Sequence, residues 1–452
     1  MTLPKKGLPG LSASIKDKLI QQALERKLRQ AGQSPASRTM FQSSARKNAV
    51  PEAFYRFDQH PGYRQLQIMN EGAARMGVRS PFFKMHEGTA GAETQIGGQP
   101  YINYASYNYL GMSGDPVVQA AAQEAMARYG TSVSASRLVS GERPIHRELE
   151  RALADLYEVD DAIAFVSGHA TNVSTIGYLF GPRDLILHDE LIHNSVLQGA
   201  QLSGAHRRSF PHNDWAALDA ILQEQRQDFE RVVIVLEGIY SMDGDYPDLP
   251  RFVEIKRRHK VFLMVDEAHS LGVMGERGYG IREHFGLAGK DVDIWMGTLS
   301  KTLAGCGGYI AGETALIEHL KFLAPGFLYS VGIPPSVAAA SLAALQRMQA
   351  LPERVAVLQA RGRYFLEAAQ AAGIDTGSST GYAVIPAITA SSLKAARLSA
   401  TLFEQGINVQ PILYPAVPEQ SARLRFFVSC LHTEEQLRQT VTALSALLQN
   451  GV

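Results

Sequence analysis

The sequence predicts an α/β protein built on a large, mostly parallel sheet. Between residues 96 and 335, short apolar runs alternate with helical stretches, and each run ends at polar or small residues. Such runs are typical of strands that are buried on both faces of a parallel sheet. They are the segments DAIAFVS, DLILHD, RVVIVLEG, VFLMVDEAH and DIWMGTLS. Ligands of open α/β sheets bind at the carboxyl ends of the strands, so functional groups are expected there.

The chain is expected to have three parts. Residues 1–95 form an N-terminal helical arm and linker, because residues 11–31 repeat apolar positions at helical spacing and residues 32–53 lose that period. Residues 96–335 form the large domain. Residues 336–452 form a smaller α/β domain, which contains the segments SVAAASLAALQRMQAL, YAVIPAIT and RLRFFVSC.

Composition indicates an ordinary soluble protein. The 452 residues are 45% hydrophobic, and 44 Lys and Arg balance 44 Asp and Glu, so global charge favours neither nucleic acid nor an anionic membrane as partner. No apolar run approaches the roughly 20 residues of a membrane span, and a cytoplasmic location is expected. The two cysteines, Cys306 and Cys430, are expected to be inert thiols in apolar surroundings.

Polar residues gather at the ends of the expected strands. Asp266 directly follows an apolar run, His269 comes three residues later, and Lys301 ends the next run. Upstream, His193 and Ser241 stand at two other strand-to-helix junctions. An isolated Asp at such a place more often caps a helix. A lysine, a carboxylate and two histidines at successive strand ends are hard to explain by packing alone.

Rival motifs fail on spacing. GTLSKT lacks the glycine that a phosphate-binding Walker loop needs immediately before its lysine, because Ser300 stands there. No H-E-x-x-H motif occurs, which disfavours a zinc hydrolase, and no G-x-S-x-G nucleophile elbow occurs. Pyridoxal 5'-phosphate (PLP) does fit: Lys301 would form the Schiff base, Asp266 would pair with the ring nitrogen, and His269 would bond to the ring hydroxyl.

Eight segments in order resemble the α-oxoamine synthase family of fold-type I PLP enzymes. They are NYASYNYLGMS, SRLVSGERPIHRELE, HDELIHNS, EGIYSMDGD, VDEAHSLGVMGERGYG, GTLSKTLAGCGGYI, YSVGIPP and ARLRFFVSCLHT. The resemblance runs from about residue 100 to the C-terminus. The family includes 8-amino-7-oxononanoate synthase, 2-amino-3-ketobutyrate CoA ligase and serine palmitoyltransferase. It implies a fold-type I architecture with a large mostly parallel-sheet domain and a smaller C-terminal domain.

The resemblance implies roles around the cofactor. His193 would stack on the pyridine ring, and Ser241 would lie near the ring hydroxyl. The phosphate cradle would consist of Gly168, His169, Thr298 and Ser300. Ser330 would reach the phosphate from a partner subunit, which implies a homodimer with shared active sites.

Other positions match the family's substrate contacts. Asn108 and Arg425 would hold the amino-acid carboxylate, a task that suits the bidentate fork of arginine. Arg423 is expected on the opposite side of the strand, in a structural role. Ser136 stands where aminolevulinate synthases tend to have a threonine, and this smaller residue allows alanine, serine or another small amino acid.

The family's chemistry is a decarboxylative condensation of a small amino acid with an acyl thioester, which gives an α-aminoketone. Lys301 would act as general base. The divergent residues ahead of YINYASYNYLG look like those of α-oxoamine synthases attached to polyketide assembly lines, where an acyl carrier protein can replace CoA as donor. The arm could equally stabilise a dimer. An aminotransferase or aldolase, or a noncatalytic subunit of a heteromer, remains an alternative.

Overall fold

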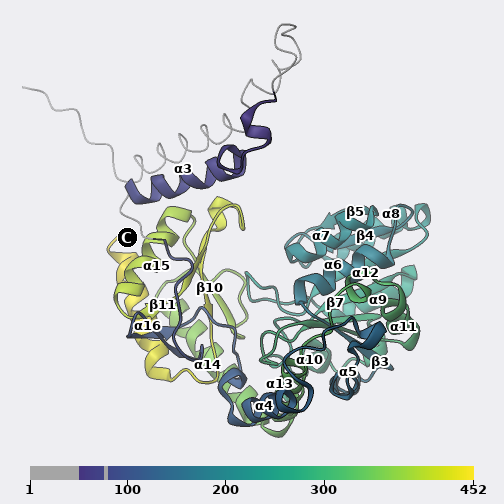
Figure 1. Ribbon diagram of the computed structural model, residues 1–452. Helices are drawn as coiled ribbons and strands as arrows, with labels where there is room; N and C mark the ends of the chain where they lie inside the picture. Colours follow the sequence, from purple (N-terminus) through teal and green to yellow (C-terminus); the bar gives the residue numbers. More distant parts are fainter. Residues whose placement is uncertain (1–49, 76–79, 452) are drawn as a thin grey trace, which may run out of the picture. The chain divides into compact units, whose positions relative to one another are not determined.

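A seven-stranded sheet is the largest sheet in the described part of the computed structural model, which covers residues 50–75 and 80–451 (Figure 1). The strand order is β3-β9-β8-β7-β6-β4-β5. The strands are β3 (Asp161–Phe165), β4 (Leu185–Asp189), β5 (His206–Phe210), β6 (Val232–Glu237), β7 (Phe262–Asp266), β8 (Ile294–Thr298) and β9 (Gly308–Gly312). All neighbouring pairs are parallel except those of β9, which runs antiparallel to β3 and β8. The mostly parallel sheet expected from the sequence is thus confirmed.

Helices cover both faces of this sheet, which explains why its inner strands are apolar throughout. In β6, Val233 and Val235 point into a core shared with helices α6, α7, α11 and α12. Val232, Ile234 and Leu236 point the other way, into a core shared with α5, α8, α9 and α13. The covering helices are α5 (Pro144–Tyr157), α6 (Gly168–Leu179), α7 (Asn194–Ser203), α8 (Trp215–Gln225), α9 (Leu249–His259), α11 (Thr314–Leu323), α12 (Pro325–Leu328) and α13 (Pro335–Ala350).

Two strands of the large sheet lack the apolar run by which the sequence indicated the others. β5 lies at the sheet edge and is mostly exposed, so its residues HRRSF form no apolar run. β9 reads GYIAG, and its glycines are required by close packing. A Cβ on Gly308 would come within 2.7 Å of the Gly168 Cα. Glycine is therefore used here to bring β9 against the start of α6.

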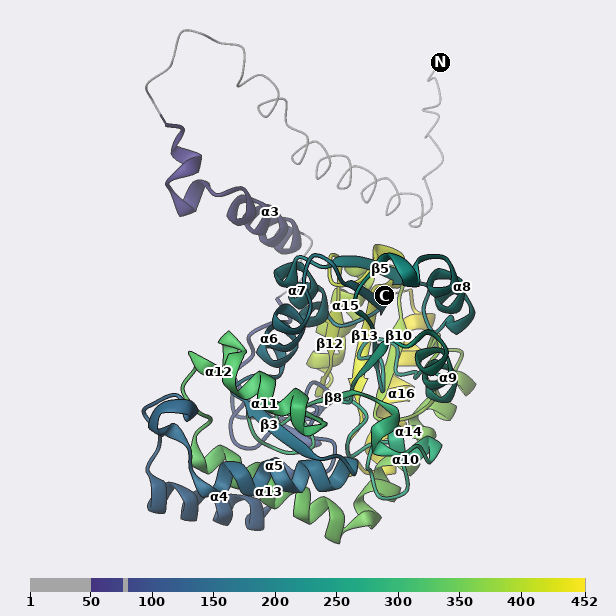
Figure 2. The same ribbon diagram turned by 90° about the vertical axis from the view of Figure 1, so that its right-hand side faces the viewer.

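Smaller sheets and the remaining helices complete the unit. Figure 2 shows the antiparallel sheet β10-β13-β12 among the C-terminal helices. Its strands are β10 (Val384–Ile388), β12 (Gln410–Ile412) and β13 (Arg423–Phe427), and a further sheet contains β1 (Glu93–Ile96), β2 (Gln99–Asn103) and β11 (Ile407–Asn408). The other helices are α4 (Pro116–Tyr129), α10 (Ile281–Phe285), α14 (Pro352–Ala371), α15 (Ser392–Glu404) and α16 (Glu434–Gln449).

The chain divides into two compact units, Met1–Gly77 and Val78–Val452. Within the first, the described elements are two short turns, η1 (Glu52–Phe54) and η2 (Phe57–Gln59), and helix α3 (Pro61–Arg75). The helix expected over residues 11–31 lies outside the described residues. The boundaries expected at residues 95 and 335 stay predictions. None of the helices within residues 50–75 and 80–451 is both long and apolar enough to cross a bilayer.

Candidate active site

A cavity of about 230 Å³ opens at the carboxyl ends of β4, β6, β7 and β8. It brings together eight of the residues that the sequence pointed to: Gly168, His169, His193, Asp266, His269, Thr298, Ser300 and Lys301. They come from four separate strand-to-helix or strand-to-loop junctions, which follow β3, β4, β7 and β8, along more than 130 residues of chain. The expectation that functional groups collect at this edge of the sheet is met by their positions.

Lys301 follows β8 and is half-buried beside two carboxyl groups. Burial lowers the pKa of its ammonium to about 8, although the negative charges of Asp266 and Glu237 oppose that change. The ring centre of Tyr107 lies 5.7 Å from Nζ. Near neutral pH a substantial fraction of this amine is therefore unprotonated, as a nucleophile or a base requires.

Asp266 ends β7 and is buried. Its Oδ1 accepts the backbone N–H of Ala268 at 2.9 Å, and its Oδ2 accepts an N–H of the Asn172 amide at 2.9 Å. Both donors are neutral, so they stabilise the carboxylate without cancelling its charge. The remaining negative charge can pair with a cation bound in the cavity.

A hydrogen-bonded chain orients His193 at the start of α7. The Asn172 amide donates to Ser195 Oγ at 2.9 Å, and that oxygen lies 2.7 Å from His193 Nδ1, which also accepts the backbone N–H of Ser195 at 3.3 Å. Burial lowers the pKa of His193, against the charge of Asp266, which raises it. Because Nδ1 accepts, the proton of the neutral ring resides on Nε2. The imidazole is thus held in one orientation.

His269 is held by two aromatic residues. The Tyr109 hydroxyl lies 2.7 Å from His269 Nδ1, and the ring of Phe427 lies nearly parallel to the imidazole, with centres 6.0 Å apart. Burial, followed by the charges of Lys301 and Arg425, lowers the pKa of His269 well below its usual value. A neutral imidazole beside Asp266 can exchange hydrogen bonds with a ring hydroxyl.

The start of α6 forms a cradle for an anion. Ser167 caps this helix by accepting the N–H of Ala170, which leaves the amides of the first turn directed at the cavity. A Cβ on Gly168 would come within 2.8 Å of Thr298 Oγ1, so only glycine allows this close approach. The Thr298 hydroxyl lies 2.8 Å from that of Ser300. These groups suit a phosphate.

Arg425 and Ser241 do not line the cavity but lie beside it. Arg425 Nη1 donates to the Ser241 carbonyl at 3.1 Å, and its buried Nε has no hydrogen-bond partner within the described residues. Arg423 was expected on the opposite side of the strand, and that expectation is wrong. It donates to Asp243 in the same loop at 2.6 Å, because residues two apart on a strand share a face.

Asn108 is engaged with its own segment instead of the cavity. Its amide donates to the Ala90 carbonyl at 3.3 Å, and its Oδ1 accepts the N–H of Ser113 at 3.3 Å. Its assignment to the substrate stays a prediction.

Cys306 was expected in apolar surroundings, but it is exposed and lines the cavity. Cys430 is half-buried, and burial raises its pKa to about 11, which fits an inert thiol.

Ser136 and Ser330 lie near one another but outside the cavity of their own chain. Ser136 precedes the helical turn η4 (Arg137–Gly141), and the segment after Ser330 is tied to it by a hydrogen bond from Gly332 N–H to the Ala135 carbonyl at 3.1 Å. Ser330 and Arg137 line a small recess of their own. The structure thus groups these two serines together and not with Lys301.

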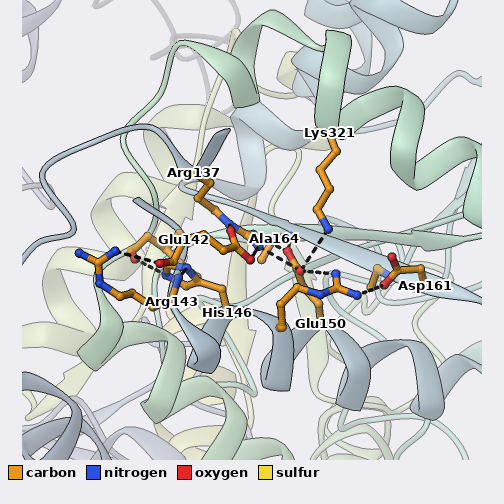
Figure 3. Close-up of polar contacts among 11 residues, drawn as sticks. Arg137, Glu142, Arg143, His146, Glu150, Asp161, Ala164 and Lys321 are labelled. Carbon is orange, nitrogen blue, oxygen red and sulfur yellow. Dashed lines mark hydrogen bonds and ion pairs between the residues drawn. The ribbon is translucent and has the colours of Figure 1, made fainter. Parts of the chain in front are cut away.

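A buried ion cluster anchors this segment (Figure 3). We call it the Arg137 cluster; it comprises Arg137, Glu142, Arg147, Glu150, Asp161 and Lys321. Arg137 pairs with Glu150 and, at 2.6 Å, with Glu142. Glu150 also accepts the N–H of Ala164 in β3 at 2.9 Å. The cluster therefore joins η4 to β3, an edge strand of the large sheet.

The sequence analysis missed four residues of the site: Tyr109, Asn172, Ser195 and Glu237. Glu237 ends an apolar run just as Asp266 does, so the rule that found Asp266 applied to it as well. Ser195 stands two residues after His193. Asn172 lies one helical turn after Gly168 and had no signal of its own, because its partners come from other segments of the chain.

Comparison with known proteins places this site in a family. The profile of the aminotransferase class I and II family matches residues 99–444. The 8-amino-7-oxononanoate synthase of Symbiobacterium thermophilum is 40% identical over 350 residues, which cover 77% of this chain and 89% of the relative. The chain belongs to the α-oxoamine synthase family. A second 8-amino-7-oxononanoate synthase, from Fervidobacterium nodosum, is 40% identical over 78% of this chain and 89% of its own length.

Solved structures agree with this membership. Serine palmitoyltransferase from S. paucimobilis, with a bound PLP-myriocin aldimine, superimposes with a TM-score of 0.82 at 29% identity and covers 86% of this chain and 98% of its own. The 8-amino-7-oxononanoate synthase of Francisella tularensis has a TM-score of 0.68 at 27% identity, covering 77% and 98%. This α-oxoamine synthase is accordingly a PLP-dependent acyltransferase of fold type I.

The residues present fit PLP. The Gly168 cradle admits a group that any side chain would exclude, and the Asn172 Oδ1 and Glu237 Oε1 atoms are buried without a hydrogen-bond partner in the described part of the chain. An amine, a carboxylate and an anion cradle thus surround one cavity, as the aldehyde, ring nitrogen and phosphate of the cofactor require.

Proposed function

We propose that this enzyme joins the Cα of a small amino acid to the acyl carbon of a thioester, with release of the thiol and of carbon dioxide. The observation that carries the proposal is the placement of Lys301, Asp266, His193 and His269 around one cavity on an α-oxoamine synthase scaffold. The names of the relatives support it, since both are acyl-transferring synthases.

The chain's own residues would hold the cofactor in place. When bound, PLP supplies a ring that accepts the electrons released at Cα. Asp266 would keep the ring nitrogen protonated, and His193 would cover one face of the ring. His269, fixed by Tyr109, would bond to the ring hydroxyl. The phosphate would lie in the cradle of Gly168, His169, Thr298 and Ser300.

Lys301 and His193 would accept and donate the protons that the reaction transfers. With a pKa of about 8, Lys301 Nζ can accept the Cα proton and return it after carbon dioxide has left. The proton on His193 Nε2 can be donated to the thioester carbonyl oxygen. Arg425, whose Nε has no partner, would bind the amino-acid carboxylate together with Asn108. Ser136 leaves room for alanine or serine at Cα.

Two chains would share each site. Ser136 and Ser330 lie away from the Lys301 of their own chain, in segments whose neighbours Leu138, Val139 and Tyr329 are exposed by 53%, 80% and 86%. Exposed apolar side chains at the edge of a site mark an interaction surface. A homodimer in which Ser330 reaches the partner's phosphate would cover them.

An acyl carrier protein is the proposed donor. Residues 1–77 contain 13 Lys and Arg against 5 Asp and Glu, so this unit carries a net charge of +8 and the rest of the chain −8. The family profile begins only at residue 99, so the basic unit lies outside the catalytic match. A strongly basic extension suits the surface of an acidic carrier protein. CoA is anionic as well, so matched donors are compared directly.

The test is a product assay with matched donors. Purified enzyme with PLP is given alanine, serine or glycine and the same acyl group on CoA or on a carrier protein, and free thiol, carbon dioxide and product mass are measured. We expect the amounts of free thiol and carbon dioxide to rise together, with a higher kcat/KM for the carrier-bound donor. Transamination releases neither product. Lys16→Glu with Lys18→Glu should lower kcat/KM for the carrier and not for CoA.

A further inference from the structure

Glu237 is a buried carboxyl group that the proposed chemistry does not use. It is the last residue of β6, is 3% exposed, and lines the same cavity as Lys301. Its Oε2 accepts the N–H of Ser241 at 3.2 Å. Its Oε1 is buried and makes no hydrogen bond within the described residues. A buried polar atom without a partner needs an explanation, because such an atom is costly unless a ligand satisfies it.

Asp266 stands directly beside it. The register of β6 and β7 pairs Glu237 with Asp266 across the two strands. Two carboxyl groups in neighbouring positions of a buried sheet edge do not both ionise, because the second charge would be buried next to the first. One of the two therefore keeps its proton.

Hydrogen bonding decides which group keeps the proton. Asp266 accepts two N–H groups, each at 2.9 Å, whereas Glu237 accepts the N–H of Ser241 at 3.2 Å, and the backbone of His193 lies near enough to lower its pKa as well. Donors stabilise the ionised form, so Asp266 carries the charge. Burial, and then the charge of Asp266, raises the pKa of Glu237 well above its usual value, which agrees with this assignment. The proton of Glu237 then resides on the unpartnered Oε1.

We propose that Glu237 is a neutral carboxylic acid whose Oε1 hydroxyl donates a hydrogen bond into the cavity and so positions the bound cofactor beside Asp266. The inference rests on the proposed function only in taking the ligand of the cavity to be PLP. Neutrality has a consequence for Asp266. Asp266 then carries the one negative charge at this position and can pair with the ring nitrogen. An ionised Glu237 would add a second negative charge beside it. The charged or titratable groups that act on Glu237 are Asp266, Lys301, Tyr240 and Arg425, and His193 and His269 line the same cavity.

Infrared spectroscopy of the PLP-free protein tests the protonation state directly. Above pH 8, where Glu267, whose pKa burial raises to about 7, is ionised, we expect a carbonyl band of a neutral carboxylic acid that disappears in Glu237→Gln. Glu267→Gln is the matched control: Glu267 is fully buried one residue after Asp266, but it accepts from Ser270 and Ile281 and does not line the cavity. The band of Glu237 should persist in that control. Its absence from the wild-type protein would overturn the proposal, whatever reaction the enzyme catalyses.

Cofactor binding tests the donated hydrogen bond. Glutamine keeps a neutral donor, so Glu237→Gln should retain the PLP dissociation constant within about threefold, whereas Glu237→Met, of similar size without a donor, should weaken binding roughly tenfold. The visible absorbance band of bound PLP should keep its pH midpoint in Glu237→Gln. Equal affinities of the two variants, or a midpoint shift of about one pH unit in Glu237→Gln, would contradict the proposal. If the Met variant does not fold, the infrared band and the midpoint decide.

Discussion

The Arg137 cluster and the cavity around Lys301 both bury charge, but they treat it in opposite ways. In the cluster, three cations meet three carboxylates, and Glu150 alone contacts Arg137, Arg147 and Lys321. In the cavity, the described residues offer Lys301 no ion pair within 4.0 Å, and the partners of Asp266 are neutral N–H groups. The charges of the cluster find their partners within the chain, whereas those of the cavity need a ligand as partner.

This difference indicates that the cluster contributes to stability and the cavity to binding and catalysis. A buried charge that is fully paired and hydrogen-bonded holds the fold, and removing one partner leaves the others exposed to the full cost of desolvation. A buried charge that is left unpaired lowers stability but is ready to bind or to transfer a proton. Variants in the cluster should therefore change stability, and variants in the cavity should change chemistry.

The largest effect is expected for Lys301→Ala. Turnover should fall by at least about a thousandfold, because both the covalent anchor and the general base are lost. The folded pKa of Lys301 lies below its unfolded value, so below about pH 8 the folded chain must bury a charge that alanine removes. Thermal unfolding of the PLP-free variant should thus show unchanged or higher stability. Wild-type turnover in this variant would refute the mechanism.

Glu150→Gln should produce the reverse pattern. Removing the central carboxylate leaves Arg137 with one partner and Lys321 with none in the cluster, at a cost of about 3 kcal/mol in the free energy of unfolding. Urea denaturation measures this loss. The visible band of bound PLP should persist at low temperature, because no member of the cluster lines the cavity. A stable variant that cannot bind PLP would break the division between the two regions.

The same contrast explains what the sequence could predict. The sequence could predict the inner strands because β6, β7 and β8 are apolar on both faces, and polar side chains stand at or just after their ends. Edge strand β5 is exposed and β9 is rich in glycine, so neither had an apolar signature. Asn172 was missed because its role exists only through partners on other segments. Contacts that assemble across the fold leave no local pattern.

A third region, around His212, differs from both, because its buried charge is paired with carboxylates but can be lost by titration. His212 lies 2.9 Å from Asp189 through Nδ1 and 2.9 Å from Asp245 through Nε2. Burial lowers the pKa of His212, but the two carboxylates have the larger effect and raise this pKa to about 10. Because the folded pKa lies above the unfolded one, the stabilisation is complete below about pH 6.5 and is lost as the pH rises through 10.

His212→Gln should therefore be destabilised in a pH-dependent way. The difference in unfolding free energy from the wild-type protein should be about 2 kcal/mol at pH 6 and should shrink steadily towards pH 10. Urea unfolding at four or five pH values measures it. A difference that stays constant over this range would show that His212 acts by packing and not by charge.

The smallest effect is expected at the solvent edge of the cluster. The Arg147 side chain is 32% exposed and pairs with Glu150 at 2.7 Å, so Arg147→Ala should cost about 1 kcal/mol, because Arg137 still compensates Glu150. Arg183→Ala, which removes an exposed pair with Glu230, should cost less than about 0.5 kcal/mol. Unfolding midpoints in urea rank the two variants. If the exposed pair proved the costlier one, burial would not be what gives the Arg137 cluster its strength.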